Sequence, residues 1–256
     1  MFVGFRRIEG VSSQSKEESR LQQIRAEEQV YHDQCYAEHV LFEPGSWLYK
    51  PVKTVLDLLP KLRNHENVRM LDLGCGVGRN TIPMAEFVMN HCASGRVIGV
   101  DLLASATEGL SAYSEQYGVA KLMRAVTSEI EAYSIEEEGY DFIVAVSALE
   151  HVRSPDVLRS KLFEIADGVK PEGIVCLVMS TNIQECMIST GEALDPKFEV
   201  NLQTEELQVL LTEAFGGWEV IDSHAKQLSY LIERQTQPVR LSSDCPTFSA
   251  RKSVYP

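Results

Sequence analysis

The chain has 256 residues, 44% of them hydrophobic and 24% charged, which is the composition of a folded globular protein. This composition excludes a chain dominated by disorder and a small domain that depends on disulfides. Acidic residues number 37 against 24 Lys and Arg, so the net charge is −13. The balance argues against nucleic acid or an anionic membrane as a partner, because both require clustered basic side chains.

The sequence carries no export or membrane signal. No stretch approaches the roughly 18 apolar residues of a spanning helix. Residues 1–10 contain Arg6 and Arg7 without an apolar run behind them, so we do not expect a secretory signal there. The six cysteines are widely spaced and include no C-x-x-C pair, and we expect reduced thiols in a cytoplasmic protein.

The N-terminal fifth of the chain is expected to be helical and then aromatic. Residues 11–30 are polar and predict a solvated helical arm, whereas 31–49 contain five aromatic side chains around a Pro44-Gly45 turn. Residues 51–62 predict a short amphipathic helix.

Apolar strands alternate with helices from residue 68 onward. Strands are expected at 68–73, 96–100, 122–126, 141–146 and 173–179, with late strands at 218–221, 247–250 and, as an option, 227–234. Helices are expected after the cap Asn80 and over 105–116, 154–167 and 204–215. Pro246 is expected to open the last strand. The alternation predicts an α/β fold with a parallel sheet covered by helices on both faces.

The strongest motif is LDLGCGVGRN, residues 71–80, where the first strand gives way to a helix. Its glycines permit a tight turn and the close approach of a ligand to the backbone. A dinucleotide-binding turn would read G-x-G-x-x-G, whereas the third glycine here comes one residue early. Asp72 suits a ligand with cationic groups, such as an α-amino group near a sulfonium. A purely structural turn is the alternative.

Asp101 is the second informative residue, because it directly follows the strand 96–100. A carboxylate at this position can accept both hydroxyls of an adenosine ribose. Taken alone, an acid after a strand is as often a helix cap. Combined with the glycine turn, it favours ligand contact.

These features resemble the class I S-adenosylmethionine-dependent methyltransferases over about residues 47–252. Segments 98–102, 139–144, 148–152 and 169–173 add to the resemblance, with Glu172 in place of one small residue. The resemblance implies a three-layer sandwich with a Rossmann-like, seven-stranded, mostly parallel sheet of order 3-2-1-4-5-7-6, whose last strand is antiparallel. It divides the chain into an N-terminal helical arm and lid, 1–46, and a methyltransferase domain, 47–256.

The resemblance also implies the cofactor, S-adenosyl-L-methionine, and no metal. Glu129 with Ile130 stands where the family has an acid whose neighbour frames the adenine, with glutamate in place of the usual aspartate. The residues implied to bind the cofactor are Trp47, Asp72, Gly74, Cys75, Gly76, Asn80, Asp101, Leu102, Glu129, Ile130 and Ser147.

The C-terminal third is similar to small tellurite-resistance-type methyltransferases. That group has a His-Arg pair in the hairpin before the final strand, whereas this chain reads Glu233-Arg234, so an oxyanion acceptor is only one option. Arg234, His151 and Tyr230 are the candidate catalytic residues. Two alternatives stay open: Arg234 pairs with a surface carboxylate, and His151 makes a structural hydrogen bond.

Weaker signals concern the aromatic and thiol residues. His32, Cys35 and His39 share a helical face and are metal-ligand types, but packing explains them better because no fourth ligand is evident. Cys75 is expected for its small size rather than for thiol chemistry. Trp47 with Tyr36 would either cover the cofactor as a lid or pack the N-terminal helix on the core.

The sequence is therefore interpreted as a cytoplasmic methyltransferase that transfers a sulfonium methyl group to a small-molecule acceptor by in-line displacement. No nucleic acid or membrane partner is expected, and the acceptor and oligomeric state stay open. Two other hypotheses remain. One is a non-catalytic cofactor-binding regulatory protein on the same fold. The other is a nicotinamide-dependent oxidoreductase, against which the glycine spacing argues.

Overall fold

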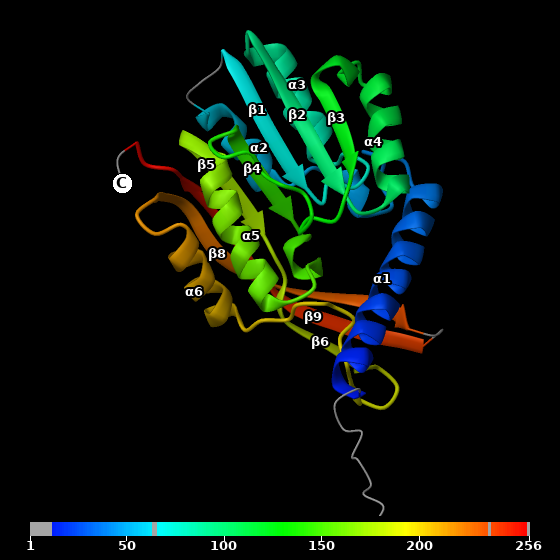
Figure 1. Ribbon diagram of the computed structural model, residues 1–256. Helices are drawn as coiled ribbons and strands as arrows, with labels where there is room; N and C mark the ends of the chain where they lie inside the picture. The colour runs from blue at the N-terminus through cyan, green and yellow to red at the C-terminus, as the bar shows by residue number, and fades with distance from the viewer. Residues whose placement is uncertain (1–11, 63–65, 235–236, 255–256) are drawn as a thin grey trace, which may run out of the picture.

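A mixed β-sheet with helices on both faces forms the centre of the computed structural model, which describes residues 12–62, 66–234 and 237–254 (Figure 1). The expectation about residues 1–10 lies outside the described residues. Five parallel strands run in the order β3-β2-β1-β4-β5. They are β1 (Asn67–Leu73), β2 (Ser94–Asp101), β3 (Met123–Thr127), β4 (Tyr140–Val146) and β5 (Val169–Val178).

Antiparallel strands extend this sheet beyond β5. Strand β9 (Gln237–Arg251) pairs with β5 through 247–251, and β8 (Glu219–Arg234) pairs with β9 over its whole length. These seven strands have the expected order, and the antiparallel last strand is confirmed. Two further strands were not expected: β6 (Thr181–Met187), which pairs with the first half of β9, and β7 (Ala193–Leu194) on β6.

The C-terminal hairpin differs most from expectation. Three short strands were expected here, but the structure has two long ones, β8 and β9. Sequence reasoning missed the full length of β8 because this strand is mostly exposed and lacks the apolar alternation that reveals a strand. Pro246 does not open β9 but lies inside it. It sits where β9 changes its partner from β5 at Thr247 to β6 at Asp244, so the missing N–H falls at a break in the ladder.

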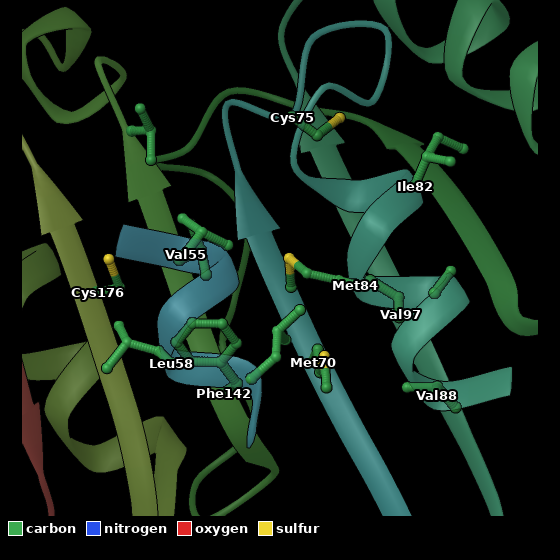
Figure 2. Packing of buried hydrophobic residues seen from close by; sticks show 14 of the residues in the cluster. Val55, Leu58, Met70, Cys75, Ile82, Met84, Val88, Val97, Phe142 and Cys176 are labelled. Atoms are coloured by element: carbon green, nitrogen blue, oxygen red, sulfur yellow. The ribbon is translucent and has the colours of Figure 1, made fainter. Parts of the chain in front are cut away.

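The helices cover the two faces as a three-layer sandwich. On one face lie α2 (Lys53–Leu58), α3 (Thr81–His91) and α4 (Ala104–Gln116), and on the other α5 (Pro155–Gly168) and α6 (Thr204–Ala214). Successive residues of β1 point to opposite faces, so Met70 packs with Val55 and Met84 in the first layer (Figure 2), whereas Leu71 belongs to the second. As expected, the Ser154 hydroxyl caps α5 by accepting the N–H of Val157.

Helix α1 (Ser12–Glu38) starts near β6 and the β8–β9 hairpin and runs past the carboxyl ends of the parallel strands toward α4 (Figure 1). Arg20 anchors it by donating to the carboxylate of Asp195 and to the carbonyl of Pro196. The segment after it is held by the Leu41 N–H, which donates to the Tyr113 hydroxyl at 3.0 Å. No helix of the described ranges combines the length and apolarity needed to cross a membrane. All six cysteines are described, and each is a free thiol.

Candidate functional site

A cavity of about 400 Å³ opens at the carboxyl ends of β1, β2 and β4, with side chains of α1 on its wall. This edge is where open α/β sheets bind their ligands, and the volume suits a small molecule. Twelve of the residues singled out from the sequence line it: Trp47, Gly74, Cys75, Gly76, Asn80, Asp101, Leu102, Glu129, Ile130, Ser147, His151 and Tyr230. Asp72 and Arg234 are not part of its lining in the described chain.

The glycine turn is fixed by the neighbouring strand. The N–H groups of Gly74 and Cys75 both donate to the Val100 carbonyl, at 2.8 and 3.0 Å. Gly74 has φ of +74°, and a Cβ added there would lie 2.3 Å from the Cβ of Ala148, so only glycine fits. Gly76 has φ of +52° and faces the Tyr36 hydroxyl, 3.2 Å from where its Cβ would be. A side chain at Gly76 would therefore strain the turn itself, and not only exclude a ligand.

Asp101 links the second strand to this turn. Its Oδ2 accepts the Gly76 N–H at 2.8 Å, and its Oδ1 accepts the Leu103 N–H at 3.0 Å. Burial raises the pKa of Asp101, although these two N–H donors oppose the shift. A carboxylate can accept about four hydrogen bonds, so lone pairs remain for a ligand. Asp101 can therefore both accept the local backbone N–H groups and bind a ligand, the two roles that the sequence left open.

Asp72 lies behind the turn rather than in the cavity. It is 1% exposed, and the Thr81 hydroxyl donates to its Oδ2 at 2.6 Å, whereas its Oδ1 has no partner among the described residues. Burial raises the pKa of Asp72 to about 7, against the opposing effects of Thr81 and Arg79. The geometry thus differs from the direct ligand contact expected for this residue.

Asn80 and Cys75 have structural contacts next to the cavity. Asn80 occupies the N-cap position of α3, but its side chain makes no capping bond, and the expectation of an Asn80 side-chain cap is wrong. Its Oδ1 accepts the Val52 N–H at 2.9 Å instead and ties the segment before α2 to the turn. Burial raises the pKa of the Cys75 thiol well above its ordinary value, which keeps it protonated and favours a packing role.

Trp47 both lines the cavity and packs against its surroundings. Its ring lies 6.2 Å from that of Tyr36 and 5.8 Å from that of His32, and the Arg79 guanidinium stands 5.1 Å from its centroid. Arg79 also donates to the Trp47 carbonyl at 3.0 Å. The described residues contain no group of three or more His, Cys, Asp or Glu placed to hold a metal.

An ion-pair network joins α1 to the loop after β3. Arg25 contacts Glu129 at 2.8 Å, Glu131 at 3.3 Å and Glu199 at 3.7 Å. Arg153 closes the network from the other side, at 2.7 Å from Glu131 and 3.3 Å from Glu129. Sequence reasoning missed Arg25, Glu28 and Gln29 of α1 because they belong to no motif. Arg79 and Glu150, in contrast, stood inside motifs already recognised.

His151 is held by acids. Its Nδ1 lies 2.9 Å from Oε2 of Glu199, and its ring stacks on Phe198 at 5.5 Å. Burial alone would lower the pKa of His151, but the hydrogen bond to Glu199 and the charge of Glu150 outweigh it and raise the pKa to about 9. This shift favours the imidazolium form at neutral pH, and the hydrogen bond to Glu199 fits a structural role better than that of a general base.

Arg234 makes a contact different from the one expected. Its Nε and Nη2 donate to the two carboxylate oxygens of Glu185 at 3.0 and 2.8 Å. The Glu185 side chain is 1% exposed, so the partner is a buried carboxylate and not one on the surface. This pairing leaves the guanidinium fork occupied. Tyr230, from the same strand, does reach the cavity.

Comparison with known proteins agrees with this site. Residues 70–173, which contain the glycine turn, Asp101 and His151, match the methyltransferase-domain family. This part of the chain is therefore similar to a methyltransferase domain. It is 28% identical over 173 residues to a ubiquinone biosynthesis O-methyltransferase of Brucella anthropi, a match covering 62% of this chain and 63% of the relative. It is 29% identical over 133 residues to a trans-aconitate 2-methyltransferase of Variovorax paradoxus, covering 50% and 45%.

The chain thus spans less than two thirds of the length of these curated relatives. Solved structures share the methyltransferase fold at low identity. TehB of Haemophilus influenzae gives a TM-score of 0.58 at 21% identity, covering 79% of this chain and 62% of TehB. A Burkholderia thailandensis 1,6-didemethyltoxoflavin-N1-methyltransferase, solved with its acceptor and S-adenosylhomocysteine, gives 0.56 at 17% identity, covering 99% and 93%.

Proposed function

We propose that the protein transfers a methyl group from S-adenosylmethionine to a small-molecule acceptor bound in this cavity. One observation carries the proposal: the methyltransferase glycine turn and the acid that follows β2 meet in a single hydrogen bond, Gly76 to Asp101, on the wall of the cavity. A structural turn unrelated to a ligand would not need to face an open cavity.

The residues present fit the cofactor. The turn at Gly76 presents backbone to the cavity without a side chain, and Asp101 keeps acceptor capacity for ribose hydroxyls. Ile130 and Leu102 supply apolar surface for an adenine, and Trp47 with Ser147 would flank the remainder. We assign these residues to cofactor binding, and we place Asp72 behind them as support for the turn.

The bound cofactor supplies an already activated methyl group on a sulfonium. The protein therefore needs mainly to align the acceptor and to exclude water, and alignment of this kind can lower a barrier by about 7–11 kcal/mol. Helix α1 is placed for the second task because its side chains line the cavity. We infer that residues 1–46 act as a lid on the domain 47–256, and slower amide exchange in α1 after addition of S-adenosylhomocysteine would test this.

We place the protein in the cytoplasm. We also propose that it acts on a metabolite rather than on nucleic acid, because its net charge of −13 disfavours binding to a polyanion. Incubation with methyl-labelled S-adenosylmethionine and a small-molecule cell extract tests the activity. Label should move into low-molecular-weight products. Cofactor binding without transfer of the methyl label, either to small molecules of the extract or to protein, would favour the regulatory cofactor-binding alternative.

A further inference from the structure

The cavity wall is strongly acidic, and this bears on the acceptor. Two arginines, Arg25 and Arg79, and two histidines, His32 and His151, are the basic side chains among the described residues that line it. Carboxylates outnumber them: Glu28, Asp101, Glu129, Glu131, Glu150 and Glu199. An anionic acceptor would be repelled by this excess, whereas a cationic one would be attracted.

Glu150 is the acid whose hydrogen bonds are incomplete. It is 1% exposed, and its Oε1 accepts the Ser180 N–H at 3.1 Å. Its Oε2 is buried and has no hydrogen-bond partner within the described chain, although the residue lines the cavity. A buried carboxylate oxygen without a donor is costly, so a turn of the side chain that brought Oε2 to a donor on a bound ligand would stabilise it.

The neighbours of Glu150 cannot take the same role. Glu199 is already bound to His151 and lies near Arg25, and Glu129 and Glu131 pair with two arginines. Nδ1 of His151 is already bonded to Glu199, and the raised pKa of the ring favours its protonated form, which cannot accept a proton. Burial raises the pKa of Glu150, with His151 and Ser180 opposing the shift, and this makes the carboxylate a better proton acceptor than an exposed glutamate.

We propose that the acceptor is an amine, cationic at neutral pH, and that Oε2 of Glu150 binds its N–H group and removes its proton. The inference rests on the proposed function, since it assigns the substrate class of the same cavity. Phe198, Tyr31 and Tyr230 also line this cavity and suit an acceptor with an apolar or aromatic body.

The reaction balances without any further reagent. The acceptor ammonium gives one proton to Glu150, which passes it to solvent. The freed nitrogen lone pair forms the N–CH3 bond while the C–S bond breaks, and the electrons of that bond stay on sulfur. The products are an N-methyl ammonium, the thioether S-adenosylhomocysteine and the released proton.

The test compares two probe sets, primary amines and carboxylic acids on the same aryl-alkyl skeletons, titrated calorimetrically into protein saturated with S-adenosylhomocysteine. We expect amines to bind and the best of them to bind at least tenfold more tightly than its matched acid. Glu150→Gln keeps the shape and the acceptor for Ser180, and should weaken the best amine at least tenfold. The exposed Glu108 serves as the matched control, and Glu108→Gln should change nothing.

Several outcomes would overturn the inference. They are acids binding as well as amines, no amine binding to the loaded protein, or Glu150→Gln binding amines like the wild type. If Glu150→Gln does not fold, Glu28→Gln is the second variant, because it removes another cavity carboxylate. It should weaken amine binding and leave the affinity for the acids unchanged or slightly higher. S-adenosylhomocysteine is titrated first and alone. Its failure to bind would count against the proposed function rather than against the amine.

Discussion

The carboxylate of Asp101 accepts the N–H of Gly76 at 2.8 Å, so the end of β2 is bonded directly to the glycine turn that follows β1. A second oxygen of the same carboxylate accepts the Leu103 N–H ahead of α4. Three chain segments are thereby fixed around one acid. The proposed cofactor site is consequently pre-formed, because its acid and its turn hold each other in place before any ligand arrives.

Asp101→Asn should weaken S-adenosylhomocysteine binding about 10- to 100-fold, or about 1.4–3 kcal/mol. The amide keeps one acceptor oxygen but loses the charge and half of the acceptor capacity that N–H groups and ribose hydroxyls would share. Calorimetry measures the change, and Asp167→Asn, at an exposed acid of α5, is the control. Wild-type affinity in a folded Asp101→Asn variant would remove this residue from the site.

Asp72 should make the cofactor-free protein less stable as the pH rises. Its pKa is raised to about 7 in the folded state, so between about pH 4 and 7 the native protein holds a proton that the unfolded chain has released. This contribution therefore falls as pH increases through that range and is lost above pH 7. Asp72→Asn should raise stability at pH 8 by about 1–3 kcal/mol relative to wild type and have little effect near pH 4. Urea unfolding at both pH values gives the comparison, and a variant no more stable than wild type at pH 8 would contradict the buried charge.

His151 should titrate far above an ordinary histidine. Its pKa is raised to about 9, so its stabilising contribution is complete below pH 6.5 and is lost as pH rises through 9. Removing the partner by Glu199→Gln should lower the pKa of His151 by at least about 1 unit, which corresponds to about 1.4 kcal/mol. NMR titration of the imidazole signals reports both values. A pKa near 6.5 in the wild type would return His151 to the candidates for a general base.

Arg234→Ala should destabilise the protein by about 1–3 kcal/mol, because it leaves the buried carboxylate of Glu185 without its charge partner. S-adenosylhomocysteine affinity should be unchanged, since Arg234 is outside the cavity lining. Adding Glu185→Gln should recover part of the loss, and denaturant unfolding of the single and double variants measures the coupling. Full stability in Arg234→Ala, together with lost turnover on an identified acceptor, would support the catalytic role that the sequence suggested for Arg234.

The parallel half of the fold follows from local patterns. Strands such as β4 are buried throughout and read as continuous apolar runs, and Ser154 with Pro155 marks the start of α5. The β6–β7 pair and the full length of β8 escape this reasoning. Strand β6 buries the polar residues Thr181 and Glu185, and β8 is mostly exposed, so neither has an apolar strand pattern. Both are held in the sheet by β9, and β7 is held by β6.

The candidate site likewise contains residues that the sequence reveals and residues that it does not. Gly76 and Asp101 could be found because each follows the end of a predicted strand, and Ile130 was implied by the family resemblance. Arg25 and Glu28 reach the cavity only because α1 crosses it, and no spacing in the sequence reveals a contact over that distance. Arg234 was misplaced for the same reason, since the burial of Glu185 on β6 depends on a strand that was not foreseen.

The central claim is that the cavity at the glycine turn binds S-adenosylmethionine and not a dinucleotide. Calorimetric titration of the cofactor-free protein with S-adenosylhomocysteine, and then separately with NAD, tests it most directly. The structure predicts one S-adenosylhomocysteine site per chain and no measurable heat from NAD at the same concentrations. Tighter binding of NAD, or no binding of S-adenosylhomocysteine, would contradict it.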